Sequence, residues 1–135
     1  MNYWLVKSEP AKYSWDTFEK EGYTFWDGVR NYQARNNLNA MREGDLVLFY
    51  HSNEGKAVIG IAKIIKEAYP DPTTMEKGWV VVDLVPEQRL EKPVTLQQIK
   101  ADKRLENIGL LRQTQLSVMA LKPEEFDIIV SLGSN

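Results

Sequence analysis

Two apolar runs separated by a short polar loop constrain the fold of this 135-residue chain most strongly. Residues 46–50 and 57–65 are rich in Val, Leu, Ile, Phe and Tyr, as strands covered on both faces are. The polar residues 52–56 between them are too few for the crossover that joins parallel strands. The sequence therefore predicts an antiparallel hairpin and argues against a βαβ sheet. Gly60 inside the second run predicts a bend or bulge, as at a barrel corner.

Further short elements are predicted on either side of this hairpin. β-forming residues predict strands over residues 2–7, 79–85 and 116–121, and looser extended stretches over 23–26 and 88–94. Capping and periodicity signals predict helices over residues 15–20, 31–41, 96–101 and 123–132. Residues 69–72 contain two prolines and predict a rigid surface loop. We expect one domain over residues 1–135 with an α+β fold, a closed or nearly closed mixed β-barrel of five to six short strands with short peripheral helices.

Composition excludes several kinds of site. The chain has no cysteine and one histidine, so disulfides, thiolate metal sites and multi-histidine metal sites are excluded. No glycine run has the spacing of a phosphate-binding loop, and we expect no cofactor. The first residues lack the features of a signal peptide, and no apolar run approaches the ~20 residues that span a bilayer. We therefore expect a cytoplasmic, monomeric protein that does not bind membranes, and its net charge of −2 provides no overall basic field.

A cluster of aromatic and polar residues begins at Trp26 and continues through Arg30, Asn31, Tyr32 and Arg35. By base rate a tryptophan belongs to the core more often than to a ligand site. An aromatic ring beside asparagine and arginine also suits an unstacked nucleobase, because the ring can stack on the base while amide and hydroxyl groups bind its edge. The residues alone leave both interpretations open.

The first strand ends in Lys7, Ser8 and Glu9. Lys7 and Glu9 are two apart on an extended segment, so they point to the same side and can form a surface ion pair. In the alternative interpretation, Ser8 and Glu9 lie at the floor of a pocket and bind the polar edge of a ligand.

The strand over residues 46–50 ends at His51. His51 can act as a base, contact a ligand or cap the strand end, and catalysis has the weakest support because no nucleophile pattern lies nearby. Tyr50 and Ser52 alternate with it, so either these two residues or His51 face the pocket.

Several blocks of this chain resemble the EVE domain, a PUA-like family related to the YTH domain. The resemblance extends from residue 2 to about residue 133 and lies in residues 4–10, 26–36, 49–52, 60–61, 69–71 and 116–118. It implies a PUA-like barrel that is a non-catalytic reader of modified bases, chiefly modified cytosine in DNA, with RNA as an alternative partner.

Carried over by position, the resemblance also implies particular site residues. Trp26 resembles the stacking aromatic, and Arg30 and Arg35 are expected at the phosphates. The implied modified-base pocket consists of Lys7, Ser8, Glu9, Trp26, Val29, Asn31, Tyr32, Tyr50, His51 and Ser52. Family members often carry a basic residue before the Leu-Ser-Val block and a proline after it. This chain has Gln115 and Ala120 there, which leaves Arg112 as the nearest substitute for a phosphate contact.

Three hypotheses of different classes follow. The first is a module that binds a modified base extruded from the nucleic acid. The second is a small hydrolase that acts on a modified nucleobase or nucleoside, with Lys7, Glu9 and His51 as acid–base groups. The third is a protein-binding module that uses the loop over residues 69–75.

Overall fold

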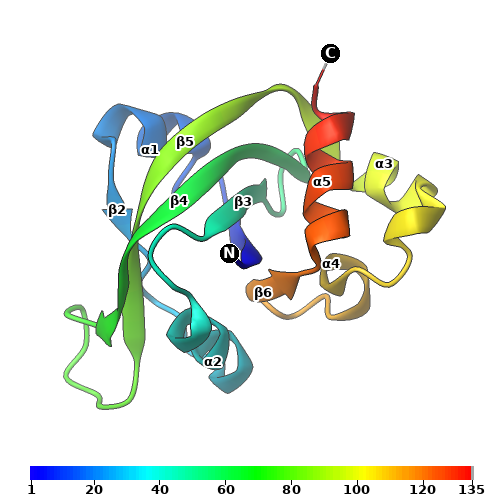
Figure 1. The fold of residues 1–135 in the computed structure, drawn as a ribbon. Coiled ribbons are helices and arrows are strands. Elements are labelled where there is room, and N and C mark those ends of the chain that lie inside the picture. The colour runs from blue at the N-terminus through cyan, green and yellow to red at the C-terminus, as the bar shows by residue number, and fades with distance from the viewer. Residues whose placement is uncertain (135) are drawn as a thin grey trace.

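A six-stranded mixed sheet forms the centre of the molecule (Figure 1). The computed structural model describes residues 1–134, and the last residue of the domain expected over 1–135 lies outside them. The strands are β1 (Tyr3–Ser8), β2 (Thr24–Phe25), β3 (Leu46–His51), β4 (Ala57–Pro70), β5 (Val80–Thr95) and β6 (Val118–Leu121). Their order across the sheet is β2-β5-β4-β3-β1-β6, and β1 and β3 are the parallel pair.

The predicted antiparallel hairpin is confirmed, since β3 and β4 pair with Leu48 opposite Ile61. The predicted irregularity at Gly60 is also confirmed. Near this residue the register of β4 shifts against both neighbouring strands. The shift against β3 lies between Phe49 and Tyr50, and the shift against β5 lies between Val58 and Gly60.

The α+β class is confirmed, but the sheet is not closed into a barrel. Its edge strands β2 and β6 contain two and four residues and pair only with β5 and β1 among the described residues. Such short edges offer little backbone for pairing with each other, so the curved sheet remains open.

The strands on the β4–β5 hairpin are longer than predicted. β4 has 14 residues and includes Tyr69 and Pro70, which were predicted to lie in a surface loop. β5 has 16 residues and joins two stretches that were predicted to be separate. Prolines suggested breaks here, but Pro86 lies beside a register shift, where a strand tolerates a residue without an N–H donor.

Short helices flank the sheet: α1 (Trp15–Glu21), α2 (Tyr32–Ala40), α3 (Leu96–Ala101), α4 (Gly109–Arg112) and α5 (Pro123–Leu132), with a 3-10 turn η1 (Lys103–Leu105). The predicted caps are confirmed, because Ser14 accepts the N–H of Thr17 and Thr95 forms a capping box with Gln98. The sequence did not predict η1 or α4. No helix within residues 1–134 has the length and apolar character needed to cross a membrane.

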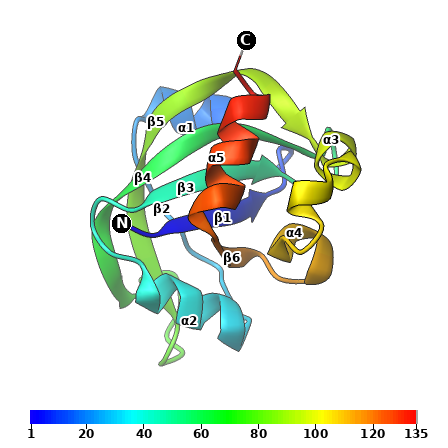
Figure 2. The same ribbon diagram turned by 45° about the vertical axis from the view of Figure 1, so that its right-hand side comes forward.

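The arrangement of two helices matters for the site. α2 lies beside β6 at one end of the sheet, near the tip of the β4–β5 hairpin (Figures 1 and 2). α5 stands apart from it, against the other end of the molecule (Figure 1).

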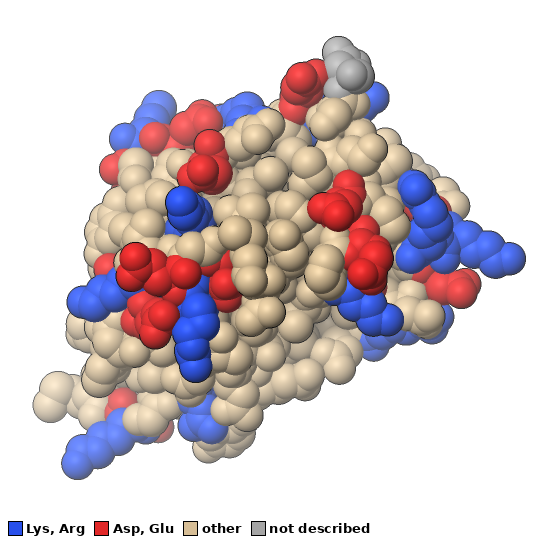
Figure 3. Space-filling view, viewed as in Figure 1, with Lys and Arg blue, Asp and Glu red and all other residues tan. Residues whose placement is uncertain are grey.

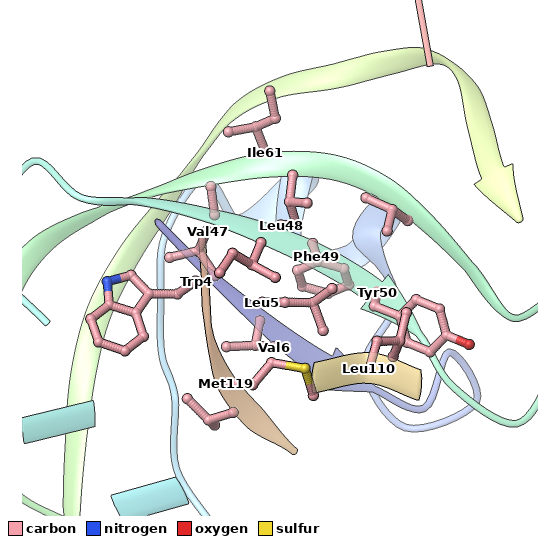
Figure 4. Close-up of a cluster of buried hydrophobic side chains, with 14 of the residues drawn as sticks. Trp4, Leu5, Val6, Val47, Leu48, Phe49, Tyr50, Ile61, Leu110 and Met119 are labelled. Carbon is pink, nitrogen blue, oxygen red and sulfur yellow. The ribbon is translucent and has the colours of Figure 1, made fainter. Parts of the chain in front are cut away.

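The core lies between the sheet and these helices. Side chains of β1 and β3 pack together with Leu110 and Met119 (Figure 4). Phe49 stacks on Phe18 with centroids 5.5 Å apart, and the edge of Trp15 meets Phe49 at 5.3 Å. This aromatic group anchors α1 to β3, which places the loop before α1 at the end of β1.

Candidate functional site

A cavity of about 860 Å³ opens between the end of β1 and the segment that joins α1 to β2. Its lining consists of Lys7, Ser8, Glu9, Lys12, Tyr13, Glu21, Tyr23, Thr24, Phe25, Trp26 and Asp27. The cavity is large enough for a planar heterocycle and combines aromatic walls with charged groups, as small-molecule sites do.

Local sequence signals shape both walls of this cavity. β1 ends at Ser8, two residues before Pro10, and the chain then turns into α1 at the Ser14 cap. Gly22 ends α1 in the left-handed conformation, with φ of 75°, and donates its N–H to the carbonyl of Phe18. The chain thus reverses direction into β2 and brings Trp26 back toward β1.

Trp26 belongs both to the core and to the cavity wall. It is 9% exposed, and its ring meets Phe49 and Tyr13 edge-to-face at 5.6 and 6.3 Å. Its indole N–H has no partner among residues 1–134, yet it is not a buried unsatisfied donor, so solvent reaches it. The protein therefore covers most of the ring and leaves a limited part of Trp26 on the cavity lining.

Hydrogen bonds hold the cavity floor in place. The Ser8 hydroxyl donates to the carbonyl of Tyr13 at 2.5 Å, and the Tyr13 hydroxyl donates to Glu21 at 2.6 Å. Burial and the neighbouring carboxylate of Glu21 raise the pKa of Tyr13 to about 12, so this phenol stays protonated at neutral pH. Ser8 and Tyr13 are thus fixed parts of the wall.

The predicted ion pair between Lys7 and Glu9 is wrong. The ammonium of Lys7 donates to the carbonyl of Thr114 at 2.9 Å, and Glu9 pairs instead with Lys12 at 3.4 Å. The reason is that β1 ends at Ser8, so Glu9 no longer alternates with Lys7 on one extended segment. Burial lowers the pKa of Lys7 from its ordinary value.

A carboxylate behind the cavity orients one of its tyrosines. Asp83 on β5 is 7% exposed and accepts hydrogen bonds from Tyr23 at 3.2 Å and from Tyr69 at 2.5 Å. Burial raises the pKa of both phenols, and the hydrogen bonds to Asp83 and its charge raise it further. The sequence reasoning missed Tyr13 and Tyr23 as cavity residues. The available signal was that both are aromatic residues next to short predicted elements, but this signal does not show which way their side chains point.

A second group lies outside the cavity, and we call it the Tyr32–Trp79 cluster. Tyr32, the first residue of α2, stacks on Trp79 with centroids 5.3 Å apart and an interplanar angle of 18°. The guanidinium of Arg30 lies 5.4 Å from the Trp79 ring, and that of Arg35 lies 5.0 Å from the Tyr32 ring. Trp79 was predicted only as a strand residue, because nothing local links it to residues 30–35.

Asp71 fixes the position of Arg30 in this cluster. Asp71 is 4% exposed and pairs with Arg30 at 3.1 Å, while it also accepts hydrogen bonds from Gly28 and Thr73. Burial opposes ionisation, but these hydrogen bonds outweigh it and lower the pKa of Asp71. The charge of Arg30 is therefore largely neutralised by the protein.

The remaining predicted site residues lie away from the large cavity. His51 accepts the backbone N–H of Trp15 through Nε2 at 3.0 Å, and Asn31 caps α2 by accepting the N–H of Ala34. Tyr50 and Ser52 line a separate cavity of about 240 Å³ that they share with Lys7. Val29 is buried in the core.

Arg112 does not join the other two arginines. Its Nε donates to the carbonyl of Glu106 at 2.8 Å, and it lines a third cavity of about 270 Å³ with Gln33 and Gln113. Of the predicted pocket, the large cavity thus brings together Lys7, Ser8, Glu9 and Trp26. No group of three or more His, Cys, Asp or Glu side chains within residues 1–134 is arranged to hold a metal ion.

Comparison with known proteins shows similarity over nearly the whole chain. The EVE domain family model matches residues 2–132. Thymocyte nuclear protein 1 of Mus musculus is 36% identical over 165 residues, which cover 97% of this chain and 73% of that protein.

Solved structures agree with this similarity. A crystal structure of a protein from Agrobacterium tumefaciens is 42% identical, has a TM-score of 0.97, and covers 98% of this chain and 93% of that one. The structure of human THYN1 in complex with 5-methylcytosine-containing DNA is 34% identical, has a TM-score of 0.92, and covers 100% and 99%. The PUA-like architecture that the sequence implied is therefore confirmed.

Proposed function

This chain belongs to the EVE domain family, and on that premise we propose that it is a non-catalytic nucleic-acid-binding protein that reads a modified base, above all a modified cytosine in DNA. Support comes from human THYN1, a relative of matching fold that was solved with 5-methylcytosine-containing DNA. The observation that carries the proposal is that Lys7, Ser8, Glu9 and Trp26 line one cavity with an aromatic wall.

In this proposal the modified base leaves the helix stack and enters the cavity of about 860 Å³. Extrusion costs a few kcal/mol, and contact with aromatic side chains together with hydrogen bonds to the base edge offsets that cost. The carboxylate of Glu9 is suited to accept a hydrogen bond from the N4 amino group of cytosine. The indole N–H of Trp26 is suited to donate a hydrogen bond to an acceptor atom of the cytosine ring. The apolar ring of Phe25, also on the lining, offers contact for a methyl group.

The hydrolase hypothesis loses its geometric support. It requires Lys7, Glu9 and His51 to act on one substrate, but Nε2 of His51 accepts the N–H of Trp15 and His51 is not on the lining of the large cavity. The protein-binding hypothesis gains no specific support either, because Asp71 of the loop over residues 69–75 is engaged by Arg30 and Thr73.

Binding to matched DNA oligonucleotides with 5-methylcytosine or cytosine at one position tests the proposal. We expect tighter binding to the methylated strand. The readout is the dissociation constant for the cytosine strand divided by that for the 5-methylcytosine strand, which we call the ratio. Trp26→Phe keeps an aromatic ring in the core but removes the indole donor, and Glu9→Gln removes the carboxylate. Each should weaken binding to both oligonucleotides at least about twofold, because cytosine and 5-methylcytosine present the same ring acceptor and N4 amino group. Phe25→Ala removes the ring offered to the methyl group and should lower the ratio.

Glu43→Gln is the matched control, because Glu43 is exposed and lies in the turn before β3, off the cavity lining. It should leave both dissociation constants unchanged. A wild-type ratio of one, or dissociation constants that all the cavity variants leave unchanged, would overturn the proposed function.

A further inference from the structure

The Tyr32–Trp79 cluster presents an open aromatic face. Tyr32 is 67% exposed although it stacks on Trp79. The guanidinium carbon of Arg35 lies 5.0 Å from the Tyr32 centroid and 5.9 Å from the Trp79 centroid, while the two centroids are 5.3 Å apart. These three distances form a nearly equilateral triangle. Arg35 therefore lies close to both rings of the stacked pair, and the 67% exposure of Tyr32 leaves much of its ring open to solvent.

The charge of Arg35 is not neutralised within the described residues. Its guanidinium donates only to the side-chain oxygen of Asn36 and the carbonyl of Gly78, and it forms no ion pair within residues 1–134. Arg30 differs, because the buried carboxylate of Asp71 pairs with it. A planar cation without a counter-ion beside an exposed ring is suited to an anion that is attached to a planar group.

Rigid supports hold the ring pair in place. Trp79 donates its indole N–H to Glu76 at 2.9 Å. The ion pair of Arg30 with Asp71 links the segment just before α2 to the tip of the β4–β5 hairpin. Arg30 and Asp71 are 41 positions apart in the sequence, so their ion pair holds two distant segments of the chain together. The platform is preorganised, so little conformational freedom is lost when a ligand binds.

We propose that the Tyr32–Trp79 cluster is a second nucleic-acid contact, separate from the modified-base cavity, which binds one unpaired nucleotide of either modification state. The base stacks on the open face of Tyr32, and Arg35 binds the adjoining phosphate. Aromatic side chains with nearby cations bind single strands in this way without selecting the base. Glu76, which accepts the indole N–H of Trp79, offsets part of the charge of Arg35, so binding by this contact alone is weak.

A short unmodified thymidine oligomer tests this site independently of base modification. We expect the wild-type protein to bind it at low salt, and Tyr32→Ala to weaken binding at least about fivefold. Tyr32→Phe keeps the ring and should retain the wild-type affinity. A uridine oligomer of the same length shows whether the strand is DNA or RNA.

An abasic oligomer separates stacking from phosphate binding. With no base to stack, Tyr32→Ala should bind it as the wild type does, whereas Arg35→Gln should weaken binding to both oligomers. Arg104→Gln is the control, because Arg104 lies in η1 and pairs with Asp102, away from both sites.

Absence of binding to the thymidine oligomer, or equal binding by wild type and Tyr32→Ala, would overturn this inference. The ratio for methylated and unmethylated cytosine tests the cavity separately. A variant at Tyr32 should weaken binding to both strands equally and leave that ratio unchanged.

Discussion

Gly60 on β4 lies against the ring of Trp15, which is fully buried. A Cβ added at this position would lie 2.6 Å from two carbons of the indole ring, closer than real side chains approach each other. The bulges around Gly60 and the position of α1 thus depend on one residue without a side chain. Because α1 forms part of the frame of the cavity, the packing at Gly60 supports the site from behind.

Gly60→Ala should lower the free energy of unfolding by about 1–3 kcal/mol, since Trp15 must shift in a filled core. Urea unfolding monitored by tryptophan fluorescence measures this change. Gly109→Ala is the matched control, because the nearest atom to its Cβ is Sδ of the flexible Met119 at 3.2 Å. A Gly60→Ala variant as stable as Gly109→Ala would contradict the packing argument.

Among the elements, α1 depends on a histidine from a different part of the chain. The N–H of Trp15 at its start donates to Nε2 of His51 at the end of β3. Burial lowers the pKa of His51; the charge of Asp16 opposes this shift, and the charge of Arg89 adds to it. The folded state therefore favours neutral His51, which is also the form that accepts the hydrogen bond.

The sign of the pH dependence follows from this lowered pKa. The unfolded chain binds a proton at His51 more readily than the folded protein, so the contribution of His51 is complete well above the ordinary histidine pKa of 6.5 and is lost as the pH falls below that value and through the lowered pKa of the folded protein. His51→Gln has a side-chain oxygen that can accept the N–H of Trp15 but does not titrate. Unfolding measured across this pH window should show a smaller loss of stability in His51→Gln than in the wild type, and parallel losses would contradict the assignment.

At the scale of the whole molecule, 17 Lys and Arg residues are balanced by 19 Asp and Glu residues. The face in Figure 3 shows Lys and Arg beside Asp and Glu, with no continuous basic surface. This agrees with the net charge of −2. Under the proposed function, binding of a polyanion would depend on a few local cations such as Arg35, and the cavity would distinguish one base from another.

Salt should therefore separate affinity from preference. Raising the salt concentration should weaken binding to methylated and unmethylated DNA by the same factor, because phosphate contacts release counter-ions and carry no information about the base. Dissociation constants at several salt concentrations check this expectation, with their ratio as the quantity of interest. A ratio that falls together with the affinity would show that charge, and not the cavity, causes the preference.

Much of the fold follows from signals that act over a few residues. The short loop over residues 52–56 requires an antiparallel hairpin, and Ser14, Thr95 and Pro123 mark helix starts because their side chains or ring act on the first turn. The resemblance in the block from Trp26 to Asn36 also predicted the family correctly.

The composition of the site depended on contacts between distant segments. Trp79 joins Tyr32, His51 binds α1, and Tyr23 binds Asp83, yet residues at such separations leave no periodic pattern in the sequence. The predicted pocket was therefore divided: Lys7, Ser8, Glu9 and Trp26 line the large cavity, whereas Tyr32 and Arg35 form a platform outside it. Local sequence determined most of the helices and strands and the helix starts that carry a capping residue or proline. Only tertiary packing decided which side chains face one another, because that depends on how the sheet curves and where its strands pair.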